Sequence, residues 1–160
     1  MSGNTIIRPY DHVKDRKSFL ALNFRTFFAS VPDAAGMSEK AFREHHRWLI
    51  GHLRPHDPTR NTVLVAEIDG RYAGHCWLGN QIDFFTRVPE PWVFDLSVVE
   101  TFRRRGVANL LLDAVEKLLA AQEIKHLGLQ VMASNPAAQS LYRKRGYTTH
   151  AMTLRKPLQG

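Results

Sequence analysis

Residues 92–121 read WVFDLSVVETFRRRGVANLLLDAVEKLLAA, and this stretch decides the fold. Its first part, residues 92–99, is apolar and rich in β-formers, as in a buried strand. From residue 106 to residue 121, apolar side chains recur at helical spacing and charged ones lie between them, which predicts an amphipathic helix. The expected apolar stripe of this helix consists of Val107, Leu110, Leu111, Ala114, Leu118 and Leu119. A strand that turns directly into a helix therefore stands at the centre of the predicted fold.

The junction between this strand and this helix carries three arginines and a glycine, Arg103, Arg104, Arg105 and Gly106. The first backbone N–H groups of a helix have no partner inside the helix, and the helix dipole favours an anion there. Gly106 has no side chain and Ala108 only a methyl group, so a diphosphate can approach the main chain while the arginines add charge-assisted contacts. The junction therefore predicts a phosphate site, with an ordinary solvated turn as the alternative.

The rest of the sequence predicts further strands and helices on both sides of this segment. Asp69 and Gly70 separate two β-rich runs and are the signal for a tight type I′ hairpin. Asn135 followed by Pro136 is a helix start, and Gly146 suits the left-handed position that closes this helix. Strands are expected at residues 5–10, 62–68, 71–78, 126–132 and 147–155, helices at 12–29 and 38–52 with Ser38 as a cap, and a loop at 80–91. This order predicts a mixed α/β sheet.

Length and composition indicate one globular domain. The chain has 160 residues, of which 44% are hydrophobic and 23% charged, so residues 1–160 are expected to form a single domain that folds alone. No apolar run reaches the roughly 18 residues needed to cross a bilayer, and residues 1–10 lack the pattern of a secretion signal. We therefore expect a cytoplasmic protein without a membrane partner.

The formal net charge of +7 shows that the surface attracts anions, which include nucleic acid, acidic lipid and small molecules with several phosphates. The arginines gather at residues 103–105 and again at 143–145, which fits two local anion sites better than a continuous nucleic-acid-binding face. Cys76, the only cysteine, lies in an apolar run and is interpreted as a core residue. The histidines lack metal-binding spacing, so no metal is expected.

Two motifs in the same chain resemble the GNAT superfamily of N-acetyltransferases. Arg103, Gly106 and Ala108 fill its acetyl-CoA signature, which is Arg or Gln, two residues, Gly, one residue, then Gly or Ala. The preceding residues 95–98 resemble its fourth strand, and residues 135–147 resemble its second conserved segment. The resemblance implies an α/β (mixed α+β) GNAT fold, a mostly antiparallel twisted sheet of about six to seven strands flanked by about four helices.

The resemblance also implies acetyl-CoA as the cosubstrate and assigns residues to it. Backbone groups would hold the pantetheine arm like an added strand, and the residues concerned are Leu96, Ser97, Val98 and Val99. The signature and diphosphate residues are Arg103, Arg104, Arg105, Gly106, Val107, Ala108 and Asn109. Asn135 would reach the arm or its adenine-side portion, and Tyr142 would lie near the thioester sulfur.

The implied reaction is direct attack of an acceptor amine on the thioester in a ternary complex, without an acyl-enzyme. An alkyl amine has a pKa near about 10, so a base must remove a proton before or during attack. Asp95 is the first candidate base, acting directly or through water, with Glu67 and His75 as substitutes. Strand alternation would place Asp95 with Val93 and Ser97, but the resemblance implies a bulge in this strand, which leaves the facing open. The alternative role of Asp95 is to cap a bulge or to pair with an arginine.

Tyr142 is the candidate general acid, because a phenol holds its proton at neutral pH and can donate it to the departing thiolate. A structural tyrosine on an apolar helix stripe is the alternative. A main-chain N–H near Val98 would stabilise the oxyanion.

The acceptor is expected to contact residues 29–37 and 80–91. These segments offer aromatic and acidic side chains, Phe84, Phe85, Asp83, Glu90 and Asp33, which would suit a cationic amine with an apolar portion. The same aromatics could close the core or a dimer interface, so a homodimer stays open. The predicted function is transfer of an acetyl group to a primary amine of a small molecule or peptide. The alternatives are a non-catalytic acyl-CoA sensor and, ranked lower, a basic nucleic-acid-binding module.

Overall fold

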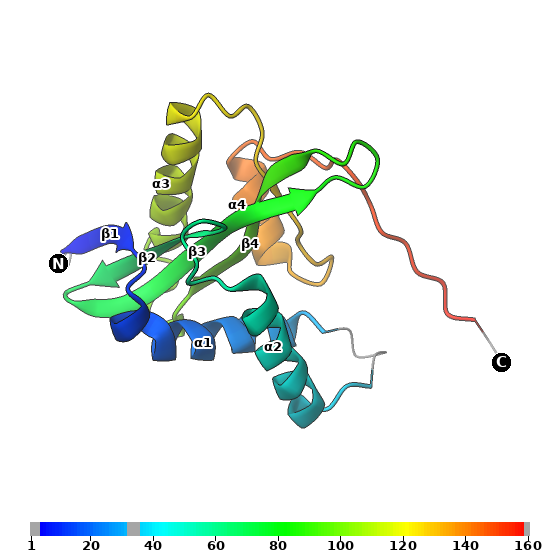
Figure 1. Cartoon of the computed structure of the whole chain (residues 1–160), viewed down its shortest axis with the longest axis horizontal. Helices are drawn as coiled ribbons and strands as arrows, with labels where there is room; N and C mark the ends of the chain where they lie inside the picture. Colours follow the sequence, from blue (N-terminus) through cyan, green and yellow to red (C-terminus); the bar gives the residue numbers. More distant parts are fainter. Residues whose placement is uncertain (1–3, 32–35, 159–160) are drawn as a thin grey trace. The chain divides into compact units, whose positions relative to one another are not determined.

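The computed structural model (Figure 1) describes residues 4–31 and 36–158. The chain divides into two compact units, Met1–Gln130 and Val131–Gly160. The single domain expected at residues 1–160 stays a prediction. The elements of the first unit are β1 (Thr5–Pro9), α1 (His12–Ala29), α2 (Glu39–Leu53), β2 (Thr62–Ile68), β3 (Arg71–Ile82), β4 (Pro89–Val98), the 3-10 helix η2 (Glu100–Phe102), α3 (Val107–Ala121) and β5 (Gly128–Leu129).

The sheet of the first unit is mixed and mostly antiparallel, as expected. Over the described residues it has five strands in the order β1-β2-β3-β4-β5; β1 to β4 pair antiparallel, and β5 joins β4 in parallel. Asp69 and Gly70 join β2 to β3 with φ values of 50° and 73°. A type I′ turn requires positive φ at both positions, so the hairpin prediction is confirmed.

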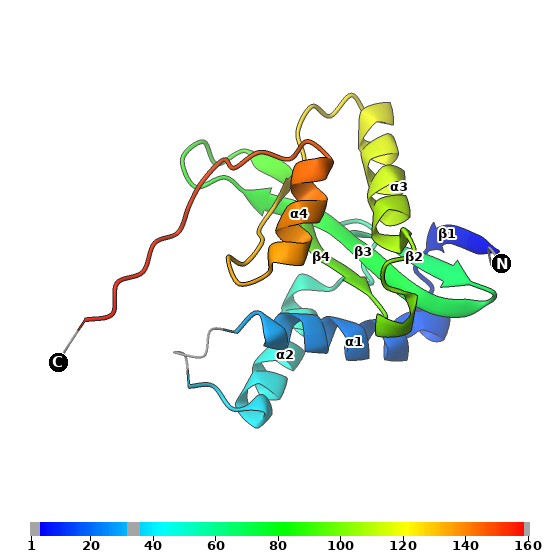
Figure 2. The ribbon, with the colours of Figure 1, turned by 180° about the vertical axis from the view of Figure 1, so that it is seen from behind.

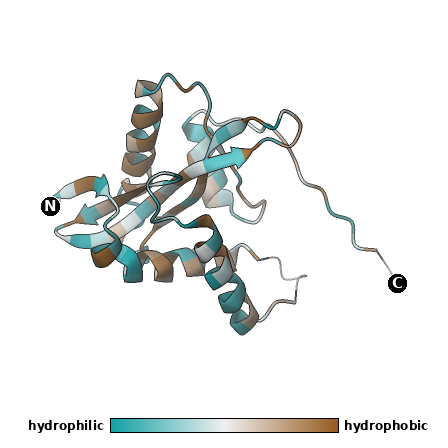
Figure 3. Ribbon diagram, in the orientation of Figure 1, coloured by the Kyte–Doolittle hydropathy of each residue, from teal (hydrophilic) through white to brown (hydrophobic). Residues whose placement is uncertain are grey.

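The sheet lies between helices on its two faces, with α3 on one and α1 and α2 on the other (Figures 1 and 2). On the α3 face, Leu111 and Val115 are fully buried in a core that includes Ala66 and Cys76 of the sheet. On the α1 face, Phe19 packs with Val63 and Trp77. Figure 3 shows α3 hydrophobic over most of its length, because this helix rests its apolar face on the sheet.

The three helices of the first unit begin where the sequence predicts. Asp11 caps α1 by accepting hydrogen bonds from the backbone N–H groups of Val13 and Lys14, and Ser38 caps α2 by accepting from Ala41. Leu110 was expected on the buried stripe of α3 but is 41% exposed, whereas Leu112 is buried. The direction in which α3 crosses the sheet selects the buried face, and spacing alone cannot fix it. No helix in the described ranges is long and apolar enough to span a bilayer.

Several predicted strand bounds are wrong. β3 continues to Ile82 and β4 starts at Pro89, so the loop expected at residues 80–91 is shorter. The strand expected at 126–132 is only β5, Gly128–Leu129. No strand is present at residues 147–155, where a final one was expected, and residues 148–155 are exposed. A strand needs a neighbour for its backbone groups, which β-propensity alone does not supply. The sheet therefore has fewer strands than the roughly six to seven expected.

The second unit contains α4 (Pro136–Lys144). Asn135 caps this helix, because its side-chain oxygen accepts a hydrogen bond of 3.1 Å from the backbone N–H of Ala138. Gly146 follows the helix with a φ of 88°, the left-handed conformation expected at that position. Both ends of this helix are therefore confirmed.

Candidate functional site

β4 has one edge that is fully paired and one that is largely open. Along β3 the pairing runs from Val98, opposite Gly74, to Pro89, opposite Ile82. Along β5 it covers only Trp92 and Val93. Over the described residues, positions 94–98 therefore face no strand on that side, and an extended ligand can add there by main-chain hydrogen bonds. This open edge contains most of the segment predicted to hold the pantetheine arm.

The close approach of β5 at the start of the open edge depends on a glycine. A Cβ built at Gly128 would come within 2.4 Å of two ring atoms of Trp92. Any larger residue would push β5 away from Trp92 or displace its ring, because real Cβ atoms do not make such contacts. Gly128 therefore fixes the point from which β4 continues without a neighbour.

The open edge of β4 ends at the N-terminus of α3. Val99 donates from its backbone N–H to the carbonyl of Ala73 at 2.9 Å, after which η2 and a turn lead into the helix. Gly106 is the cap of α3 with a φ of 79°, and a Cβ there would meet nothing within 4 Å. A glycine is thus favoured here because of the positive φ, and not because a side chain would clash with its neighbours. The space beside Gly106 is open. An anion can approach the first N–H groups of α3 from this space.

The arginines of the turn have different surroundings, although all three are exposed. Arg103 donates from Nε to the carbonyl of Val98 at 3.2 Å, so its side chain holds the turn against the end of β4. Arg105 lies over the ring of Phe102, 5.7 Å from its centroid. Arg104 lies between them with a φ of 61°. The predicted cluster therefore contains a structural arginine, Arg103, next to cations that can reach an anion.

Asp95 lies at the centre of a buried polar network on the α1 face of the sheet. Its Oδ2 accepts hydrogen bonds from Asn23 Nδ2 at 2.5 Å and His75 Nε2 at 2.6 Å, and its Oδ1 accepts from Ser97 Oγ at 2.5 Å. The side chains of Asp95 and His75 are 0% exposed. Tyr72 contacts His75 Nδ1 at 2.6 Å. Asp95 is therefore enclosed by donors and has no free face for a substrate.

The direction of each hydrogen bond in this network follows from the carboxylate acceptor. Because Asn23 donates with its amide nitrogen, its Oδ1 accepts from His46 Nε2 at 2.7 Å. Burial lowers the pKa of His46, and the nearby Arg43 lowers it further, so this imidazole is neutral at pH 7. Burial also raises the pKa of Tyr72, so its phenol keeps its proton and can donate it to His75 Nδ1. A chain of donors thus runs from Tyr72 through His75 to Asp95.

A bulge in β4 determines which way Asp95 points. The pairing with β3 passes from Asp95, opposite Trp77, to Val93, opposite Leu78, and leaves Phe94 as the extra residue. Val93 consequently packs in the core on the α3 face, while Asp95 and Ser97 point toward α1. The expectation that Asp95 shares a face with Ser97 is confirmed, and the expectation that it shares one with Val93 is wrong, because the bulge reverses the alternation.

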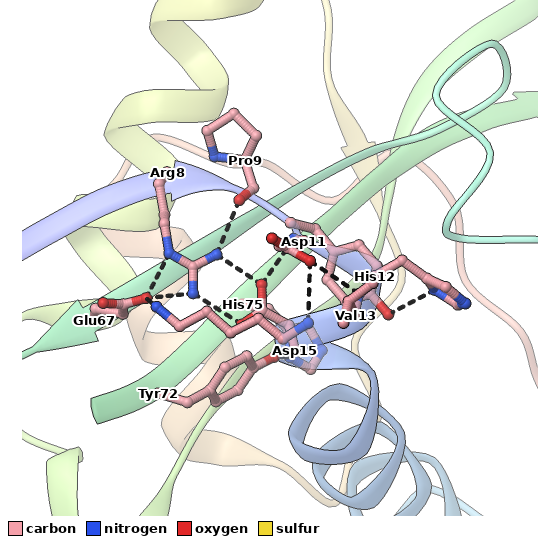
Figure 4. A network of polar contacts seen from close by, with 11 residues as sticks. Arg8, Pro9, Asp11, His12, Val13, Asp15, Glu67, Tyr72 and His75 are labelled. Carbon is pink, nitrogen blue, oxygen red and sulfur yellow. Dashed lines mark hydrogen bonds and ion pairs between the residues drawn. The ribbon is translucent and has the colours of Figure 1, made fainter. Parts of the chain in front are cut away.

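Glu67, a substitute base, belongs to an ion-pair cluster (Figure 4). Lys14 Nζ lies 2.6 Å from its Oε2, and Arg8 contacts both Glu67 and the buried Asp15. The hydrogen bonds from Lys14 and Arg8 lower the pKa of Glu67 below its usual value. A carboxylate held in this way is a weak base, so the cluster has a structural role.

Cys76 is confirmed as a core residue. It is 0% exposed in the core of the α3 face. Burial raises the pKa of its thiol, and the charge of Asp95 adds to this effect. The thiol therefore stays protonated and inert.

The second unit holds the other two predicted site residues. The side-chain oxygen of Asn135 is committed to capping α4, so only its amide nitrogen is left to contact a ligand. Tyr142 lies on α4, half-buried, with its ring edge-on to Tyr147 at a centroid distance of 5.5 Å. This contact supports a structural contribution of Tyr142 in addition to the predicted catalytic one.

The segments predicted to contact the acceptor are only partly described. Residues 32–35, which include Asp33, lie outside the described residues. At the β3–β4 turn, Asp83 Oδ1 accepts hydrogen bonds from the backbone N–H groups of Phe85 and Thr86, and this fixes the turn. Phe84 and Phe85 are 87% and 88% exposed. These aromatics therefore do not close the core of the first unit.

Four described residues of the Asp95 network were not predicted from the sequence: Asn23, Thr26, His46 and Tyr72. Asn23 lies between Leu22 and Phe24 in α1, and a buried polar residue among apolar ones is the signal that identifies it afterwards. His46 carries no such local signal, because it reaches Asn23 only through the packing of α2. Tyr72 reaches His75 of its own strand because β3 has an extra residue, Ala73, in its pairing with β2.

Comparison with known proteins gives a family match over most of the chain. A model of the Acetyltransferase (GNAT) family matches residues 21–147. The mycothiol acetyltransferase of Clavibacter michiganensis subsp. michiganensis is 32% identical over 143 residues, which cover 86% of this chain and 41% of that protein. An N-alpha-acetyltransferase of Sulfurisphaera tokodaii is 29% identical over 107 residues, 62% of each chain. The chain thus spans less than half the length of the mycothiol acetyltransferase it matches.

Solved structures share the fold. A protein of Pyrococcus furiosus described as an acetyl transferase superposes with a TM-score of 0.77 at 23% identity, over 97% of this chain and 100% of that one. The aminoglycoside N-acetyltransferase AAC(6')-Iy, solved in complex with CoA, superposes with a TM-score of 0.68 at 16% identity, over 99% and 98% of the two chains. At these identities the likeness establishes the architecture.

Proposed function

The chain belongs to the acetyltransferase (GNAT) family, and we propose that it transfers an acetyl group from acetyl-CoA to an amine. The observation that carries this proposal is the open edge of β4, which ends at the glycine-capped N-terminus of α3. An extended arm with amide groups, followed by a diphosphate, has the chemistry that these two features recognise.

The donor would be bound mainly by the main chain. Backbone groups of Leu96 to Val99 would pair with the pantetheine arm, and the first N–H groups of α3 would receive the diphosphate. Arg104 and Arg105 are exposed beside this helix end and would add charge to the contact. Arg103 would act indirectly, because it fixes the turn through Val98.

In the reaction the amine nitrogen forms a bond to the thioester carbonyl carbon, the carbon–sulfur bond breaks, and the acetylated amine and the CoA thiol are released. One proton would pass from the nitrogen through water to solvent, and one must reach the sulfur. Tyr142 would supply the second. The enclosed Asp95 has no room to take the first directly, so it would act as a positioning residue that holds His75 and, through it, Tyr72.

Binding of the donor is tested by thermal shift with CoA, acetyl-CoA and duplex DNA. A ligand that binds only the native state raises the melting temperature by mass action, so both CoA species should stabilise the protein. Stabilisation by DNA and by neither CoA species would defeat the proposal and favour the nucleic-acid-binding alternative.

Transfer is tested by thiol release from acetyl-CoA across a panel of amines that includes peptides, polyamines and aminoglycosides. Turnover on any of them supports an acetyltransferase and identifies the acceptor class, which we propose to be a primary amine. The enclosed carboxylate of Asp95 favours a second candidate, a non-catalytic acyl-CoA sensor. Tight binding of acetyl-CoA without turnover on any amine would select the sensor.

A further inference from the structure

A groove between α1 and α2 lies apart from the proposed donor site. Its volume is about 1020 Å³, and both helices line it. The apolar side chains that line it include Leu20, Phe24, Phe28 and Ile50. None of the residues from Leu96 to Asn109 contributes to its wall. The groove is thus a separate concave surface of a size that accommodates small-molecule ligands.

The charge around this groove is strongly positive. Arg16, Arg25, Arg43 and Arg47 line it, and Glu39 is the single acidic residue among the described residues of its wall. Glu39 is already paired with Arg43 at 2.5 Å. Among the described ion pairs, none involves Arg16, Arg25 or Arg47. Three arginines therefore surround an apolar surface without a carboxylate to neutralise them.

A buried imidazole adds a polar group to the wall. His46 is 5% exposed, lines the groove, and donates from Nε2 to Asn23. Its Nδ1 forms no hydrogen bond with the described residues, and among these no fully buried side-chain nitrogen lacks a partner. Nδ1 is therefore not fully enclosed by the described residues, and on the neutral ring it is the nitrogen that can accept a hydrogen bond. The wall thus combines apolar surface, cations and one buried acceptor.

We propose that this groove binds a small amphiphilic anion, with an aromatic or aliphatic body on the apolar wall and a carboxylate, sulfonate or phosphate on the arginines. Apolar burial supplies affinity, and the arginine fork selects the anion. A cationic ligand is disfavoured, because it would bring a positive charge among three unpaired arginines. None of the residues proposed to hold the donor lines this groove, whereas Ala29 of the predicted acceptor segment and His46 of the Asp95 network do.

The test uses a matched pair of fluorescent probes. 8-Anilinonaphthalene-1-sulfonate and N-phenyl-1-naphthylamine have the same rings, but only the first carries an anionic group. Each is titrated into the full chain in the presence of saturating CoA, so that the donor site cannot contribute. We expect the sulfonate to bind with near-unit stoichiometry and at least about tenfold more tightly than the neutral probe, as loss of a charge-assisted contact implies.

Two variants localise the binding. Replacing Arg16, Arg25 and Arg47 together by Gln should lower the affinity for the sulfonate probe at least about tenfold. The affinity for the neutral probe should stay within about twofold of the parent's. The matched control replaces Arg60, Lys117 and Lys125 by Gln, which removes the same charge from exposed positions outside the groove and should change neither affinity.

Gly51 provides a steric test that does not rely on charge. It lines the groove within α2, and a Cβ there would meet nothing within 4 Å. Gly51→Phe should therefore fold normally, fill the groove and weaken both probes at least about tenfold. Phe84→Ser with Phe85→Ser removes the exposed aromatic surface of the β3–β4 turn, outside the groove, and should leave both affinities unchanged.

The outcomes separate clearly. The proposed site is supported if the arginine variant binds the sulfonate probe more weakly and Gly51→Phe binds both probes more weakly. The proposal would be overturned if the parent bound the two probes with equal affinity, or if either variant kept the parent's affinity for the sulfonate probe. Displacement of the sulfonate probe by CoA would also overturn it. A variant whose circular dichroism shows that it has not folded is replaced by Arg16→Gln alone, for which a weaker sulfonate affinity is expected and an unchanged one contradicts the site.

Discussion

Asp95 lies at the centre of the buried polar network on the α1 face of the sheet. It accepts from Asn23, His75 and Ser97, and these donors are themselves held by His46, Tyr72 and Thr26. A buried carboxylate is stable only when such donors compensate its lost hydration. The same contacts that make Asp95 stable remove it from direct contact with a substrate. Its role in the first unit is therefore to position its neighbours.

Asp95→Asn tests this role. The amide places N–H groups where a carboxylate oxygen accepts, so at least one buried donor loses its partner. We expect the free energy of unfolding, measured by urea denaturation, to fall by about 2–4 kcal/mol. Ser97→Ala, which removes one donor, should cost about 1 kcal/mol. A variant at position 95 as stable as the parent would show that the network does not support the fold.

If Asp95 positions His75 for the reaction, the Asn variant should also shift the pH profile of turnover at temperatures where it is fully folded. If the role of Asp95 is only structural, the Asn variant should have a lower melting temperature than the parent and a pH profile of the same shape.

Tyr142→Phe tests the proposed general acid. Without the phenolic proton, the departing thiolate must be protonated by water, so turnover should fall by about 100-fold while the affinity for acetyl-CoA changes by less than about threefold. Turnover is measured by thiol release under steady-state conditions, and the affinity for acetyl-CoA by thermal shift. Tyr147→Phe, which alters the ring packed edge-on against Tyr142, is the control and should keep its turnover. Unchanged turnover in Tyr142→Phe would remove the assignment.

At the scale of elements, the segment from β4 to α3 combines two recognition surfaces in one short stretch of chain. β4 loses its β5 partner after Val93, and α3 begins at Val107 with a glycine cap. Both features rest on backbone geometry, a bulge at Phe94 and a positive φ at Gly106. The side chains of the turn vary in role, since Arg103 fixes the turn while its neighbours are free to point outward. The proposed donor site is therefore built mainly from the main chain.

Gly106→Ala separates backbone strain from ligand approach. Alanine at a φ of 79° should destabilise the fold by about 1 kcal/mol, and its Cβ enters the space beside the α3 N-terminus. We expect the affinity for CoA, measured by isothermal titration calorimetry, to fall at least about tenfold. Gly70→Ala, at a φ of 73° in the β2–β3 turn, is the matched control: its stability loss should be similar, and its CoA affinity unchanged. Equal CoA binding by the two variants would contradict the placement of the diphosphate.

At the scale of the whole molecule, a cluster of ion pairs joins β1, α1 and β2 in the first unit, in addition to their apolar packing. Arg8 of β1 contacts Asp15 of α1 and Glu67 of β2, and Lys14 reaches the same glutamate. Asp15 and Glu67 are buried, so their charges are stable only while the cations stay in place. The cluster thus couples the first strand, the first helix and the sheet.

This cluster makes stability depend on acid. Burial would raise the pKa of Asp15, but hydrogen bonds from Arg8 and from the backbone of Asp11 outweigh it, so the pKa is lowered; that of Glu67 is lowered by Lys14 and Arg8. Groups with a lowered folded pKa bind fewer protons when folded. They contribute stability above their unfolded values of about 4, and this contribution is lost as pH falls further.

Arg8→Gln should lower the free energy of unfolding by about 3 kcal/mol at pH 7 and flatten its decline in acid, as measured by urea denaturation at a series of pH values. Arg43→Gln is the control. Both side chains of the Arg43–Glu39 pair are exposed to solvent, so the pair should contribute less than about 0.5 kcal/mol to the free energy of unfolding. A decline in acid as steep in the Arg8 variant as in the parent would locate the pH dependence elsewhere.

The sequence by itself determined the local features of this protein. The periods of α1, α2 and α3, the caps Ser38 and Asn135, and the glycines at positive φ are all set by residues a few positions apart. The strand–turn–helix junction could be found for the same reason. The predicted limits of the strands were less accurate, because a strand exists only where a neighbouring strand pairs with its backbone groups. Residues 147–155, predicted as a strand, do not form one.

Only the tertiary structure decided the environment of the candidate site. The bulge at Phe94 turned Asp95 toward α1, and the packing of that helix brought Asn23 to it across 72 residues of sequence. His46 joined the same network from α2, and the groove between the two helices collected arginines that are scattered along the chain. The physical reason is that burial and hydrogen-bond partners at such separations depend on how helices pack on the sheet, and no local pattern of residues encodes that packing.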